Sequence, residues 1–261
     1  MIKKLNEKLN SQVMSFLKEE PSINLFIIGD IESFGYDKDF QELWGDFSET
    51  GELRGVLLRF YDTYIPYGKP GYDSEGFLNI IKANPNVKGI SGKEEILLPF
   101  EQSMKNRFKK QLTYFSECTL ESFSFQQEIE ASIKEAGIED IDRILSLRET
   151  IQEFVPNPNA KEMMMKGIET KTARTYYIEM NHEMVACAST TAENSISAMV
   201  VGVCTHNDHR QKGYASLVVQ KLAKDLLKEG KSLCLFYDNP KAGRIYHKIG
   251  FKNIGKWTML R

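Results

Sequence analysis

One segment near the C-terminus limits the fold most strongly, because it has the pattern of a buried strand, a glycine-containing turn and an amphipathic helix. The strand is the apolar run 198–203, and the turn occupies residues 210–215. After the turn, apolar side chains recur at helical spacing, at Leu217, Val218, Leu222, Leu226 and Leu227. A turn that opens a helix presents unpaired backbone N–H groups, and the helix dipole adds partial positive charge there. With Arg210 and Lys212 adding formal charge, the turn is predicted to bind a pyrophosphate.

A second pattern follows in the same order along the chain. A short apolar strand at 233–237 leads to Asn239 and Pro240, which are typical of a helix N-cap and first helical position. The next helix carries Tyr246 and is predicted to end at Gly250-Phe251.

Together the two patterns resemble the GNAT superfamily of N-acetyltransferases. The acetyl-CoA signature of that family, Q/R-x-x-G-x-G/A, lies between its fourth strand and third helix, and here it is matched by residues 210–215. The family commonly continues with N-x-x-A-x-x-x-Y-x-x-x-G-F, matched here by residues 239–251. The resemblance is strong over 200–251 and looser back to about residue 137. It implies an α/β fold in which a mixed sheet is flanked by helices.

The resemblance also implies a site for acetyl-CoA. In the family, two neighbouring strands splay apart, their free backbone N–H groups bind the pantetheine arm, and one of them polarises the acetyl carbonyl. The resemblance places Val203, Cys204 and Thr205 at the splayed strands and Asn239 beside the pantetheine arm. The pyrophosphate turn would consist of Arg210, Gln211, Lys212, Gly213, Tyr214 and Ala215. Asn239 could equally serve only as a helix cap.

Two residues are candidates for proton transfer. The family often places at the position of Tyr246 a phenol that protonates the departing CoA thiolate, although a tyrosine at helical spacing is more often core. An amine acceptor must lose a proton before attack, and acetyltransferases commonly use a carboxylate from the central strands for this. Glu179 is the best placed, ahead of Glu183 and Glu193 near expected turns.

The first half of the chain repeats the pattern of two helices and a hairpin without the signature. The expected hairpin strands are 42–47 and 53–60, and those of the second half are 174–179 and 184–191. We therefore predict a tandem arrangement, with a degenerate acetyltransferase-like domain at 1–125 and an acetyl-CoA-binding domain at 126–261. The tail 256–260 is expected to be the last strand of the second domain.

Composition excludes several classes of function. A net charge of −2 gives no basis for nucleic-acid binding through a basic surface. The four cysteines lack the spacing of a zinc site, and no metal is expected. Neither a signal-peptide pattern nor a stretch of membrane-spanning length is present, so we expect a cytoplasmic protein without a membrane partner.

The function implied is transfer of an acetyl group from acetyl-CoA to a primary amine by direct attack. The acceptor could be a small molecule or a peptide, and the first domain would add a wall of the acceptor site or a homodimer surface. The alternative is a non-catalytic acyl-CoA-binding or regulatory protein on the same fold.

Overall fold

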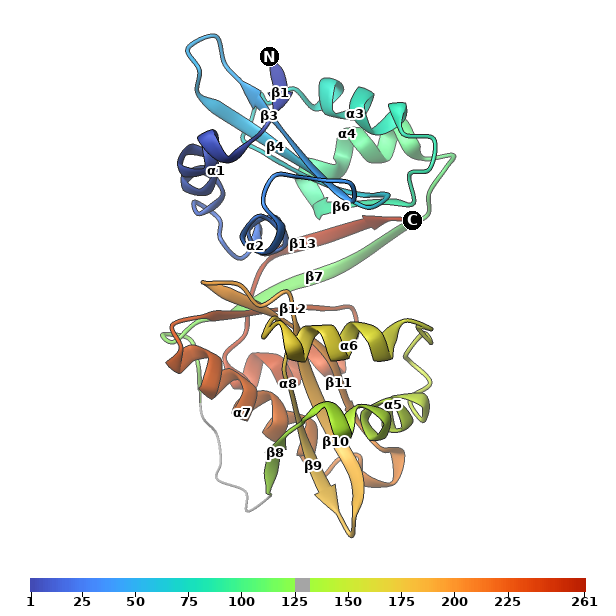
Figure 1. Ribbon diagram of the computed structural model, residues 1–261. Coiled ribbons are helices and arrows are strands. Elements are labelled where there is room, and N and C mark those ends of the chain that lie inside the picture. The colour runs from blue at the N-terminus through green and yellow to red at the C-terminus, as the bar shows by residue number, and fades with distance from the viewer. Residues whose placement is uncertain (125–131) are drawn as a thin grey trace. The chain divides into compact units, whose positions relative to one another are not determined.

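The computed structural model describes residues 1–124 and 132–261 (Figure 1). The expected junction between the domains, at residues 125 and 126, lies outside the described residues. The chain forms two compact units, one comprising Met1–Phe115 with Asn253–Arg261 and the other Ser116–Lys252. None of the described helices is long and apolar enough to cross a membrane.

The first unit is a mixed sheet with helices. Its helices are α1 (Asn10–Leu17), α2 (Leu25–Phe34), α3 (Ser74–Ala83) and α4 (Glu94–Met104). Its strands are β1 (Ile2–Lys4), β2 (Asp37–Lys38), β3 (Gln41–Phe47), β4 (Leu53–Phe60), β5 (Thr63–Gly68), β6 (Gly89–Lys93) and β13 (Lys252–Leu260), and β7 (Lys110–Cys118) begins in this unit. The sheet order is β1-β3-β4-β5-β6-β13, with β2 paired to β3. All pairs are antiparallel except β5 with β6.

The C-terminal strand β13 completes the sheet of the first unit. Its residues pair with β6 from Trp257–Lys93 to Leu260–Ile90, and the Trp257 ring is buried against Phe115 with ring centroids 5.4 Å apart. The sequence interpretation had assigned residues 253–261 to the domain 126–261. The structure places them in the first unit because β6 offers an edge that β13 fills.

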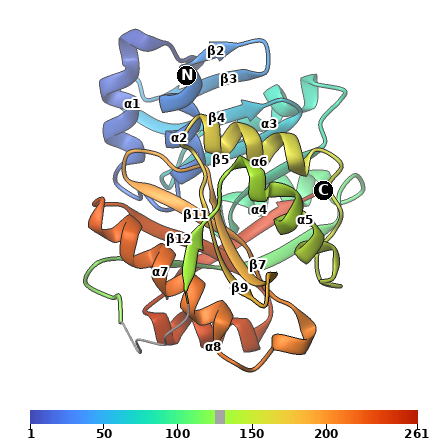
Figure 2. The ribbon, with the colours of Figure 1, turned by 60° about the horizontal axis from the view of Figure 1, so that its bottom comes forward.

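The second unit is built on the strand order β12-β11-β10-β9-β8. Its strands are β8 (Ile133–Glu135), β9 (Thr175–Met180), β10 (Glu183–Thr191), β11 (Ser197–Thr205) and β12 (Ser232–Tyr237). Its helices are α5 (Ile141–Glu149), α6 (Ala160–Glu169), α7 (Tyr214–Lys228) and α8 (Pro240–Ile249). Within this order β11 and β12, both labelled in Figure 2, run parallel, and the other neighbouring pairs are antiparallel.

Strand alternation sends the side chains of these strands to two separate cores. Tyr176 and Ile178 lie in the core under α7, and the intervening Tyr177 lies in the core under α5. The predicted apolar stripe of α7 is confirmed, since all five of its residues are buried in the first of these cores. Burying each such side chain contributes about 1.5–3 kcal/mol, so this stripe is a main reason why the helix forms.

The predicted internal repeat is confirmed in architecture. Each unit has two helices, a three-stranded antiparallel meander, a helix, a strand parallel to the last meander strand and a further helix. The units differ in the loop before the third helix. In the first unit that loop packs the Tyr72 ring onto Gly68 and caps α3 through Asp73, whose Oδ1 accepts from Gly76 N at 2.8 Å. That loop also holds a basic residue and a glycine with positive φ, Lys69 and Gly71 (φ +87°), but the Lys69 ammonium is paired with Glu19 at 2.8 Å.

Candidate functional site

The strands β11 and β12 part before they end. Their pairing runs from Ser197–Ser232 to Met199–Cys234, whereas β11 continues to Thr205 and β12 to Tyr237. In the described chain, the backbone groups of β11 that point toward β12 beyond Met199 have no ladder partner. The parting lies where the sequence placed Val203, Cys204 and Thr205, and it leaves a strand edge that an extended ligand could pair with.

A bulge in β11 lies at the same place. The register with β10 shifts between Cys187–Cys204 and Ser189–Val201, so that Gly202 and Val203 face the single residue Ala188. Gly202 has φ +61°, a left-handed conformation that favours glycine. A bulge redirects the backbone groups beside it, and here it turns the segment around Val203 away from regular pairing.

The turn after β11 has the backbone of an anion-binding loop. Gln211 and Gly213 both have positive φ, at +66° and +81°, and such alternation lets successive N–H groups converge. Residues 211–213 are exposed, and α7 starts at Tyr214. The first helical hydrogen bond runs from Leu217 N to Gly213 O at 3.1 Å, so the N–H groups of the preceding turn are left for a ligand.

Arg210 and Lys212 bring charge to this turn. Lys212 is exposed, whereas the Arg210 guanidinium lies 3.3 Å from the Glu153 carboxylate. Both partners of that pair are largely solvent-exposed, so water and salt weaken it. Arg210 can therefore exchange Glu153 for a phosphate at small cost.

Asn239 caps α8, as one of the two sequence interpretations stated. Its Oδ1 accepts from Lys241 N at 2.9 Å, and Pro240 occupies the first helical position. Because β11 and β12 are parallel, their carboxyl ends lie at the same edge of the sheet. This topology places Asn239 at the edge where the turn 210–213 also begins.

Tyr246 lies on α8 between two aromatic rings. Its ring centroid is 6.0 Å from that of Tyr237 and 5.9 Å from that of Phe251. Burial raises the pKa of Tyr246 to about 12. The phenol therefore keeps its proton at neutral pH, as a proton donor must, although the same contacts also make it part of the core.

Gly250 and Phe251 have a structural role in this arrangement. Gly250 ends α8 with φ +112°, and a Cβ there would lie 2.8 Å from the backbone of Phe123. Phe251 is almost fully buried in the core under α7. The G-F end of the motif thus lets α8 stop against the passing segment 122–124.

Glu179 is held in ion pairs away from the bulge. Its carboxylate pairs with Arg143 and with Lys134, and the hydrogen bond from Arg143 lowers the pKa of Glu179 below its usual value. In the sheet, Glu179 on β9 lies opposite Met184 on β10. Met184 is four residues along β10 from Ala188, which faces the bulge, so Glu179 lies roughly 14 Å from the bulge. A base role for Glu179 stays a prediction that these surroundings disfavour. Glu193 is also engaged, with Arg174 at 2.8 Å.

Arg148 is a residue that the sequence interpretation did not select. It projects from α5 to the bulge, where its guanidinium lies against Gly202 and Nη2 donates to Ser189 Oγ at 2.6 Å. A signal was available, because Arg148 follows Ile141 and Ile144 at helical spacing and so places a charge in an apolar stripe.

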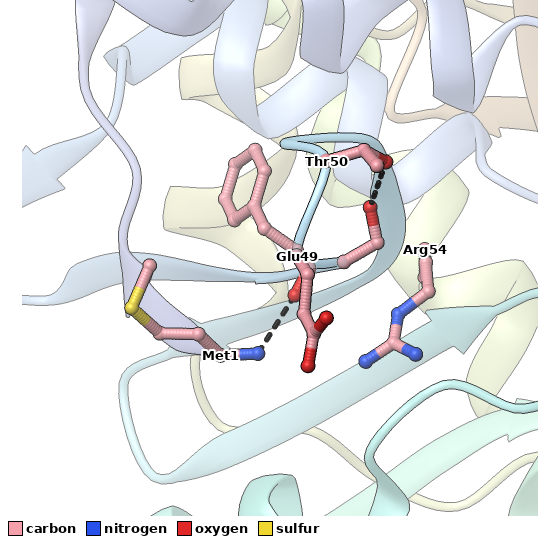
Figure 3. Close-up of a pocket in the computed structure, with 6 residues that line it drawn as sticks. Met1, Glu49, Thr50 and Arg54 are labelled. Atoms are coloured by element: carbon pink, nitrogen blue, oxygen red, sulfur yellow. Dashed lines mark hydrogen bonds between the residues drawn. The ribbon is translucent and has the colours of Figure 1, made fainter.

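Two cavities in the described parts of the chain lie elsewhere. The larger, of about 470 Å³, is in the first unit beside Met1, Phe47 and Arg54 (Figure 3). Its cationic groups, the Met1 amine and Arg54, are both paired with Asp46. The smaller, of about 340 Å³, lies beside Ala136 and Ile168. Within residues 1–124 and 132–261, no group of three or more His, Cys, Asp or Glu side chains is arranged to hold a metal ion.

Comparison with known proteins identifies the fold. Residues 179–260 match the family model described as FR47-like protein. An acetyltransferase of the GNAT family from Colwellia psychrerythraea is 15% identical, with 100% of this chain and 98% of that chain covered and a TM-score of 0.60. A tandem GNAT protein from the clavulanic acid biosynthesis pathway is 13% identical, with 100% and 97% covered and a TM-score of 0.60.

A third solved structure, of a Drosophila protein, is 8% identical, with 100% and 98% covered and a TM-score of 0.72. No curated protein matches the chain in sequence. At these identities the solved structures show the fold alone. The predicted fold class is confirmed: the chain has the mixed α/β fold of GNAT proteins in tandem, and its C-terminal part carries a GNAT-related, FR47-like domain.

Proposed function

We propose that the protein is an acyltransferase that moves the acetyl group of acetyl-CoA to a primary amine. The observation that carries this proposal is the parting of β11 and β12 beside the bulge at Gly202, immediately before a basic turn that opens α7. An exposed strand edge suits the amide-containing pantetheine arm, and the N–H groups of the turn suit the pyrophosphate.

Each part of the site has a role in the proposed reaction. Residues 210–215 would hold the pyrophosphate, and Val203, Cys204 and Thr205 would pair with the pantetheine through their backbone. The amine nitrogen attacks the thioester carbonyl carbon, so that a C–N bond forms and the C–S bond breaks. An N–H of the bulged segment stabilises the developing oxyanion, a contribution of about 2.7–4 kcal/mol in comparable sites.

Two protons complete the reaction. The departing thiolate takes one from the Tyr246 hydroxyl, and the acceptor nitrogen releases one to solvent or to a carboxylate. The protonated state of Tyr246 at neutral pH supports the first transfer. No described carboxylate at the bulge supports the second, so we propose release to water.

Calorimetric titration with acetyl-CoA tests the cofactor site. The Gly213→Glu variant adds a carboxylate where the pyrophosphate would lie and should lose micromolar binding. Gly230→Glu is the matched control, because Gly230 also has positive φ, lies at the opposite end of α7, and an added Cβ there meets no described atom within 4 Å. Equal loss in both variants, or no binding by the native protein, would contradict the proposal.

Turnover separates catalysis from binding alone. CoA release should appear when a panel of primary amines is added to the protein with acetyl-CoA. Tight binding of acetyl-CoA without turnover of any amine would instead favour the non-catalytic acyl-CoA-binding alternative.

A further inference from the structure

The guanidinium of Arg148 covers the bulge of β11 on the face of the sheet that α5 packs against. A Cβ built on Gly202 would lie 2.7 Å from Arg148 Cζ, so the cation rests on the backbone itself. Its side chain is held there by Ser189 Oγ, which in turn lies 2.6 Å from Thr175 Oγ1. Ser189 and Thr175 are both at least nine-tenths buried, so the guanidinium is seated on a rigid polar support.

Arg148 lacks a counter-charge in the described structure. Within residues 1–124 and 132–261, no carboxylate lies within 4 Å of its guanidinium. The guanidinium instead contacts the Ser189 hydroxyl, the Met164 thioether at 3.6 Å and the Cys187 thiol. Its Nε is buried and has no hydrogen-bond acceptor among the residues that the structure describes. By contrast, Arg143 on the same helix is paired with Asp140 and Glu179, and Arg174 with Glu193 and Glu229.

The positive charge acts on its surroundings. The pKa of the Cys187 thiol is lowered, first by a hydrogen bond from Cys204, whose sulfur is 3.5 Å away, and then by the charge of Arg148. A half-buried cation with only neutral partners is unfavourable unless an anion completes the site. The forked shape and charge of the guanidinium favour a carboxylate as that anion.

We propose that Arg148 binds the carboxylate of an α-amino acid acceptor and so determines which amines the enzyme acetylates. This inference rests on the proposed acetyltransferase function. In an α-amino acid the amine nitrogen is joined to the carboxylate carbon through one Cα, by bonds of about 1.46 and 1.52 Å. A carboxylate held by the Arg148 guanidinium therefore keeps the amine close to the bulged backbone, where the thioester carbonyl is expected.

Matched acceptors test the inference directly. A panel of α-amino acids and their carboxamides is assayed for acetyl transfer with the native protein, each pair differing only in the negative charge. We expect each accepted amino acid to exceed its amide in kcat/KM by about 10- to 100-fold, the range for a charge-assisted contact. Equal rates for acid and amide, or turnover only of amines without a carboxylate, would overturn the inference.

Variants locate the effect. Arg148→Gln should raise the KM for the amino acid and reduce the preference for acid over amide to less than about threefold, and Arg148→Lys should restore part of it. Acetyl-CoA binding by calorimetry should be unchanged in both. Arg143→Gln is the matched control on α5, because the Arg143 guanidinium is already paired with carboxylates. The preference of this variant for acid over amide should equal that of the native protein.

The outcomes distinguish the two proposals. If the native protein does not bind acetyl-CoA, the proposed acetyltransferase function itself is wrong. Intact acetyl-CoA binding without transfer to any amino acid would overturn only the acceptor inference. Should Arg148→Gln fail to fold, the acid-to-amide preference of the native protein still decides the question.

Discussion

Arg148 occupies the space into which a side chain at Gly202 would project. An added Cβ would lie 2.7 Å from Arg148 Cζ, and Gly202 also has φ +61°. We predict that Gly202→Ala lowers the free energy of unfolding by more than the about 1–2 kcal/mol that the left-handed conformation alone costs a residue with a Cβ. Urea unfolding measures the loss.

Gly230→Ala separates the two contributions. Gly230 has φ +79°, but no atom of the described residues lies within 4 Å of an added Cβ, so its substitution carries only the backbone cost. The difference between the two alanine variants then reports the displacement of Arg148. Equal losses would mean that the guanidinium moves aside freely and that Arg148 is not fixed over the bulge.

Tyr246→Phe tests proton donation to the thiolate. The variant should lower kcat by about 100-fold, at the lower end of the range for general acid catalysis, while the KM for acetyl-CoA stays near the native value. Because burial raises the pKa of Tyr246 to about 12, its protonated form persists as pH rises through 10. The native kcat should therefore show no alkaline decline from this group below about pH 11.

Tyr237→Phe is the control for that substitution. The Tyr237 hydroxyl lies 3.0 Å from His247 Nε2, so this tyrosine has a partner within the fold. Its removal should change stability more than kcat. A Tyr246→Phe variant with native kcat would assign Tyr246 to the core alone.

Asp30 on α2 should make the stability of the protein depend on pH. Burial raises the pKa of its carboxyl to about 7 from 3.8. Between about pH 4 and 7 the folded state then binds more protons than the unfolded state, so the free energy of unfolding falls as pH rises. Above about pH 7 the Asp30 carboxyl is ionised in the folded state, and the full cost of burying its charge lowers the free energy of unfolding.

Asp30→Asn should remove that dependence. One pKa unit corresponds to about 1.4 kcal/mol, and because Asp30 is only half-buried we expect a gain of about 1–3 kcal/mol at pH 8 that shrinks toward pH 4. Urea unfolding at the two pH values measures it. A variant that is less stable than the native protein at pH 8 would show that the carboxylate is stabilised by its surroundings.

The first unit should depend on the C-terminal strand. Deletion of residues 253–261 removes the pairing with β6 and the buried Trp257 ring, and loss of a buried aromatic side chain alone costs about 3–5 kcal/mol. The chain has two tryptophans, so Trp44 on β3 becomes the sole fluorescence probe, and it lies in the first unit. We expect the unfolding transition of the first unit, followed by Trp44 fluorescence, to occur at a much lower urea concentration in the truncated chain than in the native protein.

A peptide of residues 250–261 should partly restore the transition when added to the truncated chain. A fragment of residues 1–125 that unfolds at the native urea concentration would contradict the structural role of β13. It would support instead the division at residue 125 expected from the sequence.

Local patterns in the sequence predicted the elements that local physics controls. The stripe of α7, the cap at Asn239 and the turn before Tyr214 were all predicted from residue spacing, because helix periodicity, capping and glycine conformations involve only neighbours within a few residues. The hairpins of both units followed from strand patterns in the same way.

Partners distant along the chain could not be predicted in this way. Glu179 looked free for catalysis, but an arginine 36 residues earlier binds it. Arg148 looked like an ordinary helix residue, but the bulge of β11 brings Gly202 beneath it. Both contacts, Glu179 with Arg143 and Arg148 with Gly202, depend on how β9, β10 and β11 align against α5.

By itself the sequence determined the fold family, the order of its elements and the basic turn at the start of α7. Only the tertiary structure decided that β13 completes the first unit and that Arg148 lies over the bulge with no counter-charge from residues 1–124 or 132–261. The physical reason is that hydrophobic and capping patterns act over a few residues, whereas strand edges and buried charges find partners only once the sheets have formed.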